Sequence, residues 1–193
     1  MKLVLASASP ARLITLRRAG LDPEVVISNV AEDEVASTNP VHYANALAQM
    51  KCRTVAQSQD EDALVIGCDS VLSFKGAILG KPANAAEAIS RWRRMRGESG
   101  VLVTGHCVSY RGQEVVEAAE TIVHFAEISD AEIEAYVATG EPLVVAGAFT
   151  IDGKGGPFIS GIEGDPHNVV GISLPLVRRM FADVGVNWTD LWN

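Results

Sequence analysis

The sequence predicts a mixed α/β fold in a single domain that spans residues 1–193. Apolar runs typical of strands alternate with segments of helical periodicity along the chain. Apolar residues make up 48% of the sequence and charged residues 21%, which is the balance of a globular protein. No repeat, low-complexity tract or linker divides the 193 residues. We therefore expect one domain with room for two lobes, burying roughly 70% of its unfolded surface.

The N-terminal part of the chain has four predicted elements. They are strands at residues 2–6 and 25–28 and helices at residues 11–19 and 40–57. Ser9 is a natural N-cap for the first helix, Pro10 suits its first position, and Gly20 ends it. In the second helix, a stripe of small apolar residues also contains Lys51, which must either extend to solvent or point into a polar cleft.

In the remainder of the chain, the sequence predicts hairpins and three more helices. The strands are at residues 63–67, 71–74, 77–79, 101–110 and 114–125, and the helices are near residues 84–96, 129–139 and 173–184. Lys75-Gly76 and Arg111-Gly112 are typical hairpin turns. We expect residues 147–164, which are rich in glycine, to form a loop. At the C-terminus, Trp188 and Trp192 are expected to cover the core, with contact with a partner as the alternative.

Composition and charge argue against several classes of function. The formal net charge of −8 disfavours binding of polymeric nucleic acid, although local cations could still hold a small phosphorylated ligand. The arginines of residues 91–96 alternate with an apolar face, so we expect them to be solvated. Neither a membrane span nor a signal peptide is evident, so we expect no membrane partner. Three cysteines without a C-x-x-C pair predict buried thiols rather than disulfides or a zinc site.

Candidate functional residues lie where predicted strands end. Ser7 and Ser9 occupy the turn before the first helix, where free N–H groups and the helix dipole suit a phosphate, and Arg12 follows in the first helical turn. Asp69 stands at the end of an apolar strand, where open α/β sheets bind their ligands. The alternative interpretations are an ordinary capped turn and an Asp that caps the next turn.

Two other features are weaker on their own. Lys81 lies between a glycine that permits close approach of a ligand and a proline that fixes the backbone, but it could equally be a surface lysine. The loop that carries Glu32, Asp33 and Glu34 is acidic, which usually indicates a solvated surface, although one carboxylate could reach a metal ion.

The order of these motifs along the chain is more specific than any one of them. They are Leu5-Ala-Ser-Ala-Ser-Pro10, Leu47-Ala48 with Lys51, Ile66-Gly-Cys-Asp-Ser70, Leu79-Gly-Lys-Pro82, Thr104-Gly105, Gly140-Glu-Pro142, Ala146-Gly-Ala-Phe149 and Asn168-Val-Val-Gly171. Over nearly its whole length the sequence resembles the Maf family of nucleotide pyrophosphatases.

This resemblance implies a cytoplasmic enzyme that cleaves nucleoside triphosphates to monophosphates and pyrophosphate with a divalent metal ion, Mg²⁺ or Mn²⁺. It implies a two-lobed α/β fold, similar to that of inosine triphosphatases, with the active site in the cleft between the lobes, and a homodimer. Asp69 matches the catalytic base. Glu32 matches an acidic metal ligand when aligned without gaps, with Asp33 or Glu34 as alternatives. The residues that match phosphate-binding positions are Ser7, Ser9, Arg12, Lys51 and Lys81.

The sequence departs from the family pattern at several positions. Ala11 replaces the first of two arginines, so phosphate affinity is lowered unless Lys154 compensates. Ser70 and Asp152 replace a Thr and a Gln that are typical of members preferring thymidine and uridine triphosphates. An ionised Asp accepts hydrogen bonds but cannot donate them, so Asp152 favours the N–H donors of a guanine-like base. The alternative for Asp152 is a turn-forming residue before Gly153.

Two rival functions share these motifs. One is a house-cleaning triphosphatase that acts on modified nucleotides, with the same chemistry and a different base pocket. The other is a nucleotide-binding regulator of cell division with little or no catalysis, which the intact Asp69, Lys51 and Lys81 disfavour.

Overall fold

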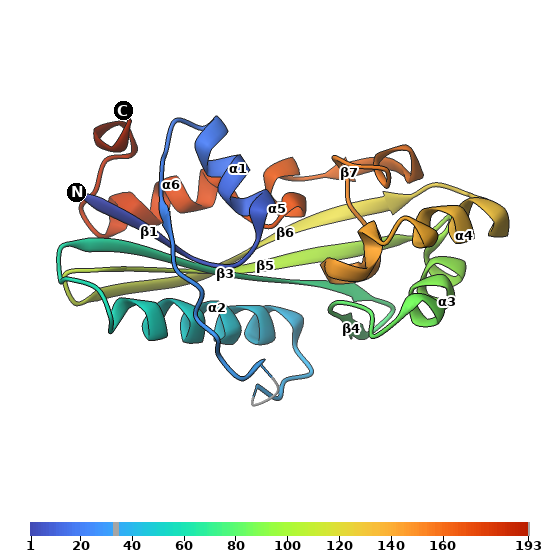
Figure 1. Ribbon diagram of the computed structural model, residues 1–193, viewed down its shortest axis with the longest axis horizontal. Coiled ribbons are helices and arrows are strands. Elements are labelled where there is room, and N and C mark those ends of the chain that lie inside the picture. Colours follow the sequence, from blue (N-terminus) through green and yellow to red (C-terminus); the bar gives the residue numbers. More distant parts are fainter. Residues whose placement is uncertain (33–34, 193) are drawn as a thin grey trace.

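A mixed seven-stranded sheet runs along the length of the molecule (Figure 1). The computed structural model describes residues 1–32 and 35–192. Strand order is β2-β1-β3-β5-β6-β7, with β4 paired to β3 beside this path. The strands are β1 (Lys2–Ala6), β2 (Glu24–Val25), β3 (Ala63–Phe74), β4 (Ala77–Leu79), β5 (Ser99–Tyr110), β6 (Gln113–Phe125) and β7 (Ile159–Glu163).

Helices cover both faces of the sheet and one of its ends. They are α1 (Pro10–Arg18), α2 (Pro40–Ala56), α3 (Ala85–Met95), α4 (Asp130–Ala138), α5 (Pro166–Val170) and α6 (Leu174–Asp183). Helix α2 runs along one face, α1, α5 and α6 lie on the other, and α3 and α4 gather at one end (Figure 1). This arrangement confirms the predicted α/β class and its two lobes.

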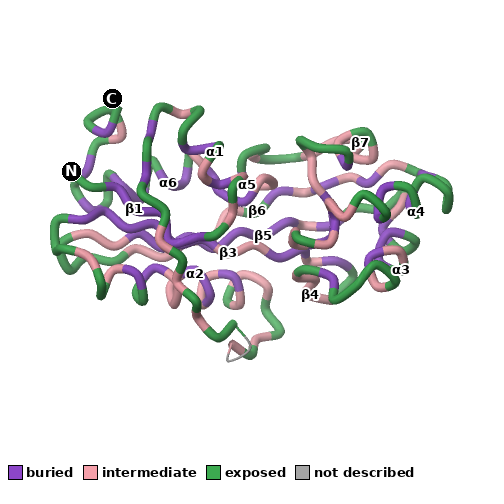
Figure 2. Tube along the Cα trace, in the orientation of Figure 1, coloured by how far each residue is buried: buried purple, intermediate pink, exposed green. Residues whose placement is uncertain are grey.

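The long strands provide the interior of both lobes, as the buried trace in Figure 2 shows. One apolar cluster joins Leu5 and Ile66 of the sheet to Phe181 of α6. A second, in the other lobe, contains Trp92 of α3, which is fully buried and packs edge-to-face against Phe125 and Tyr136. Each lobe therefore packs against its own half of the same strands.

One edge of β3 is paired in two separate segments. Parallel β1 pairs with Ala63–Gly67, and antiparallel β4 pairs with Leu72–Phe74. Because β5 occupies the opposite edge, the residues of β3 from 68 to 71 have no strand beside them on this edge within the described residues. The turn after β1 and the turn after β4 both reach this gap. The gap in the sheet is therefore where the two lobes meet.

Two glycines let α2 lie unusually close to the sheet beside the gap. A Cβ on Gly67 would lie 2.4 Å from Ala48 O, and one on Gly105 would lie 2.3 Å from Ala44 O. Gly105 is the cross-strand neighbour of Asp69. Any larger side chain at these two positions would push α2 away from the sheet, and with it the side chains that α2 directs toward Asp69.

The structure corrects several boundaries of the predicted elements. The second strand is Glu24–Val25 rather than residues 25–28, and β3 continues through the polar Asp69-Ser70 step that the prediction treated as its end. Strand β7 was missed because glycine-rich surroundings hide its pattern, although it pairs with β6. Helix α5 was missed because its five residues are too short for a periodic signal.

Side-chain predictions were also corrected at the surface. Trp188 stacks on Phe181 as expected, whereas Trp192 is 57% exposed and contacts the backbone at Ala19 and Gly20. Arg91, expected to be solvated, is buried because it has acceptors of its own on α3 and in the loop before it. The three cysteines are buried free thiols, as predicted.

Candidate active site

A cleft with a volume of about 830 Å³ lies over the gap in the edge of β3. One lobe contributes the turn after β1 and the inner face of α2, and the other contributes the turn after β4 and residues 144–152. This is the size range of pockets that enclose small molecules. Its lining includes eight residues that the sequence analysis selected: Ser7, Ser9, Arg12, Glu32, Lys51, Asp69, Lys81 and Asp152.

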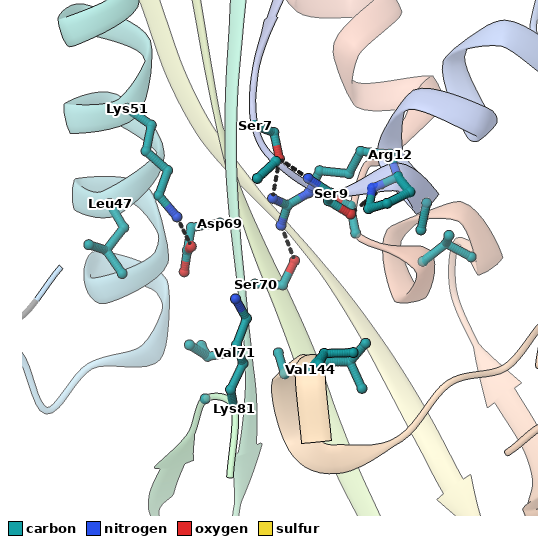
Figure 3. Close-up of a pocket in the computed structure, with 18 of the residues that line it drawn as sticks. Ser7, Ser9, Arg12, Leu47, Lys51, Asp69, Ser70, Val71, Lys81 and Val144 are labelled. Atoms are coloured by element: carbon teal, nitrogen blue, oxygen red, sulfur yellow. Dashed lines mark hydrogen bonds and ion pairs between the residues drawn. The ribbon is translucent and has the colours of Figure 1, made fainter. Parts of the chain in front are cut away.

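Asp69 and Ser70 lie at the centre of the cleft, on β3 itself. Successive side chains of a strand point to opposite faces, so these two neighbours serve different partners. Asp69 points toward Lys51 on α2, and Ser70 points toward Arg12 on α1 (Figure 3). The long strand thus holds one acidic and one hydroxyl group in fixed positions between the two helices.

Lys51 lies between two carboxylates. Its Nζ is 2.5 Å from Asp69 Oδ1 and 2.7 Å from Glu32 Oε1. The side chains of Lys51 and Asp69 are 12% and 13% exposed, so this pair is largely shielded from water. Burial tends to raise the pKa of Glu32, but the hydrogen bond and positive charge of Lys51 outweigh it, and the pKa is lowered. Of the two alternatives for Lys51, the polar cleft is the one that the structure contains.

Three acceptors hold the side chain of Arg12 beside the turn after β1, which the sequence predicts to bind a phosphate. Its Nε donates to Gly171 O at 2.7 Å, Nη1 donates to Ser7 Oγ at 3.1 Å, and Nη2 donates to Ser70 Oγ at 3.0 Å. Ser9 Oγ caps the helix by accepting from Arg12 N, as predicted. A guanidinium has five N–H donors, so two remain for a ligand. Arg12 is therefore both a structural clamp and a cation at the cleft.

Residues of the Thr104-Gly105 and Asn168–Gly171 motifs hold the acceptors of Arg12 in place through further hydrogen bonds. Ser70 Oγ lies 2.8 Å from Thr104 Oγ1, which donates to Asn168 O at 3.2 Å. The fully buried Asn168 also donates to the backbone of β5 and β6, and so fixes α5. Sequence reasoning missed these roles, although both motifs were visible in the sequence.

Lys81 approaches the gap from the other lobe. It follows β4, is exposed, and extends toward Ser70 and Val71 in Figure 3. No acidic side chain among the described residues lies within ion-pair distance of its Nζ. Its charge nevertheless contributes to lowering the pKa of Glu32. Three cations, Arg12, Lys51 and Lys81, thus line the same cleft as Asp69.

The second lobe contributes an apolar part of the cleft lining. Val144, Val145, Phe149 and Ile151 belong to it, and Val144 is 68% exposed. Asp152 follows in the same segment, is exposed and also lines the cleft. Lys154, the proposed substitute for the missing arginine, does not line the cleft in the described part of the chain, and its N–H donates to Glu141 Oε2.

Glu141 organises the loop that carries Asp152. Its carboxylate accepts from Thr150 Oγ1 at 2.6 Å, Tyr136 OH at 3.1 Å and Gly155 N at 3.0 Å, besides the Lys154 bond. Burial tends to raise its pKa, but these donors outweigh burial and lower it. This residue was not among the predicted site residues, although its Gly-Glu-Pro motif was noted.

Asp33 and Glu34, the alternatives to Glu32 as a metal ligand, lie outside the described residues. No helix of the described chain is long and apolar enough to span a membrane.

The fold and the cleft define an α/β protein that offers a cluster of cations and carboxylates to an anionic ligand beside an apolar compartment. Comparison with known proteins agrees with this class. The model of the Maf family, described as Maf-like protein, matches residues 2–184, so the chain belongs to the Maf family.

Two curated proteins with similar sequences align with this chain over most of their length. A protein of Salinispora tropica named nucleoside triphosphate pyrophosphatase is 56% identical over 100% of this chain and 88% of that protein. One of the same name from Streptomyces coelicolor is 56% identical over 99% of this chain and 94% of that protein. A solved nucleoside-triphosphatase (dITP/XTP pyrophosphatase) from Mycobacterium abscessus covers 66% of this chain and 76% of its own, with a TM-score of 0.41 and 21% identity.

Proposed function

We propose that this protein hydrolyses nucleoside triphosphates at the α-phosphorus, releasing a nucleoside monophosphate and pyrophosphate. The observation that carries the proposal is that Asp69, paired with Lys51, lines the same cleft as Arg12 and Lys81. A triphosphate carries about four negative charges, so it needs several cations close together. The names of the relatives support the same activity.

In this reaction Asp69 acts as the general base. It takes a proton from a water molecule, whose oxygen forms a bond to the α-phosphorus while the bond from that phosphorus to the bridging oxygen breaks. Pyrophosphate leaves with both bonding electrons, and Lys51, Lys81 and Arg12 stabilise its negative charge. Phosphate oxygens give Lys51 new acceptors, which frees Asp69 from its ion pair for proton transfer.

We further propose that Glu32 and Asp69 hold a divalent cation such as Mg²⁺ or Mn²⁺. Both carboxylates converge on the same Lys51 ammonium, so they face one small volume at the cleft. The described residues contain no group of three His, Cys, Asp or Glu side chains that could hold a metal ion, so water or substrate oxygens would complete the coordination. This suits Mg²⁺, which prefers oxygen ligands and usually keeps several waters and substrate phosphates. The cation supplies positive charge and makes water easier to deprotonate.

The nucleoside would lie in the apolar part of the cleft, with its base near Asp152. Val144 and Phe149 offer apolar surface to a base, and the carboxylate of Asp152 can accept hydrogen bonds from its edge. We therefore propose a preference for bases with N–H donors, such as guanine, over uracil and thymine. If its substrates carry modified bases with such donors, the enzyme would be a house-cleaning triphosphatase that removes non-standard nucleotides.

The test is pyrophosphate release from a panel of ordinary, methylated and deaminated nucleoside triphosphates, with and without Mg²⁺ or Mn²⁺. We expect release that depends on the metal ion and falls by about 10²–10⁴-fold in Asp69→Asn, the usual contribution of a general base. Normal turnover by a folded Asp69→Asn protein would overturn the mechanism. Tight nucleotide binding without any turnover would instead favour the regulator of cell division.

Three other expectations stay predictions beside this activity. They are a cytoplasmic location, assembly as a homodimer, and a single domain in which both lobes form one catalytic unit.

A further inference from the structure

Arg91 of α3 is a buried arginine outside the proposed catalytic groups. Its side chain is 10% exposed, and its hydrogen bonds join it to the turn after β4 and to its own helix. Nη1 donates to Gly80 O at 2.6 Å, while Nε and Nη2 donate to Glu87 Oε1 at 3.1 Å and 2.6 Å. A guanidinium removed from water requires such acceptors, and here one of them is the carbonyl directly before Lys81.

Glu87 holds the same turn at its other end. Its Oε2 accepts from Ala83 N at 2.7 Å, while its Oε1 accepts from Arg91. The Ala83 N–H and Arg91 lower the pKa of Glu87, so it stays ionised in neutral solution. The backbone on both sides of Lys81 and Pro82 is therefore tied to one Arg–Glu pair on α3.

The carbonyl of Gly80 has a second donor from the apolar side of the cleft. Gly147 N donates to Gly80 O at 3.1 Å, beside the bond from Arg91. The turn that carries Lys81 is thus joined to residues 144–149, which line the apolar compartment. One carbonyl fixes the relative positions of a cation and of an apolar surface in the same lobe.

We infer that Arg91 is a positioning residue that, with Glu87, holds Lys81 at the pyrophosphate side of the cleft. This inference rests on the proposed function, in which Lys81 binds the departing pyrophosphate. Lys81 itself is exposed and extends from a short turn, so its position depends on the backbone around it. A planar guanidinium can serve Gly80 O and Glu87 at once, whereas a lysine ammonium has no such fork.

The test is a double-mutant cycle with two readouts. The variants Arg91→Met, Lys81→Met and the double variant are compared for kcat/KM and for the Kd of inorganic pyrophosphate measured by calorimetry. We expect Arg91→Met to lose roughly 10- to 100-fold in both, the scale of a misplaced catalytic group. In the Lys81→Met background the same change should have almost no further effect, because the positioned group is already absent.

Arg91→Lys provides the graded comparison, and we expect it to fall between the wild type and Arg91→Met. It also carries the test if Arg91→Met fails to fold, which thermal unfolding would show. Arg94→Gln is the matched control, because it removes a charge from the same helix at an exposed residue that lies over Phe74 and does not contact the turn. Its kinetics should match those of the wild type.

The outcomes separate the inference from the function beneath it. Full activity and normal pyrophosphate affinity in Lys81→Met would overturn the role proposed for Lys81, and the inference with it. A defective Lys81→Met with normal Arg91→Met and Arg91→Lys proteins would overturn the inference alone. Equal losses from Arg91→Met in both backgrounds would also overturn it, because they would show a general structural role.

Discussion

The two lobes supply the cleft in different ways. The lobe of β1 and α2 places Lys51 and Asp69 on a helix and a strand, and it pairs these charged side chains with each other. The lobe of α3 and α4 supplies loops, whose backbones are held by Arg91 and Glu141. Reacting groups that tolerate little displacement thus stand on a strand and a helix. The second lobe instead offers Lys81 and Asp152 from loops, which can vary without disturbing the sheet.

Apart from Asp69→Asn, the largest effect should come from removing the positive charge of Lys51 in the first lobe. In Lys51→Met, Asp69 and Glu32 lose their shared cation and the leaving group loses one stabilising charge, so kcat/KM should fall by about 10²–10³-fold. Steady-state kinetics at saturating metal would measure this. Lys75→Met is a matched control, because Lys75 is half-exposed and pairs with Glu98 far from the cleft. Normal kinetics in Lys51→Met would show that the paired charges of the first lobe do not contribute to catalysis.

A second effect would distinguish metal binding from base catalysis within the same lobe. Glu32→Gln keeps the size of the side chain but loses the charge, so the concentration of Mg²⁺ needed for half-maximal activity should rise by about 10- to 100-fold. Titration of activity with Mg²⁺ would show whether excess metal restores turnover. Unchanged metal dependence would exclude Glu32 as a ligand of the metal ion and would favour Asp33 or Glu34 in that role.

The sequence was most informative where a residue's role follows from its local pattern. The N-cap at Ser9, the small-residue stripe of α2 and the apolar strand before Asp69 all place their side chains by local rules. The proximity of these residues to each other could be expected only from the family resemblance, because nothing local sets the distance between α2 and β3. That distance depends on Gly67 and Gly105, which lie directly against α2 and have no Cβ atom to hold the helix away from the sheet.

What the sequence could not show depends on contacts between distant segments. Arg91 lies in an arginine-rich run and has the pattern of a solvated residue until the carbonyl of Gly80 is brought beside it. Likewise, the Glu141 carboxylate has no visible role until Thr150 and Gly155 fold around it. Hydrogen bonds of buried polar groups are set by tertiary structure, which a periodic pattern does not encode.

A third, smaller effect would test the selecting role of the second lobe. Asp152→Asn replaces an acceptor-only side chain with one that also donates, so discrimination between guanosine and uridine triphosphates should decrease by about tenfold. The kcat/KM values for the two nucleotides would be compared, with Asp152→Ala as the control for simple loss of the side chain. Equal losses for both nucleotides would show that Asp152 does not contact the base.

The smallest effect concerns acid stability, and it also differs between the lobes. The pKa values of Glu32 and Glu141 are lowered in the folded protein, so each carboxylate stabilises it above the unfolded pKa of about 4.3. That contribution is lost as the pH falls through the lower, folded pKa. Glu141 accepts from two side chains and two backbone N–H groups, whereas the half-exposed Glu32 accepts from Lys51.

We therefore expect Glu141→Gln to lower the thermal midpoint by a few degrees at pH 7 and by less as the pH approaches 3. Glu32→Gln should change the midpoint less at either pH, because solvent screens its half-exposed ion pair. Thermal unfolding of the wild type and both variants between pH 3 and 7 would measure the difference. If Glu32→Gln were the more destabilising change at pH 7, the charged lobe rather than the loops would depend more on its carboxylate for stability, and the contrast between the two lobes would be reversed.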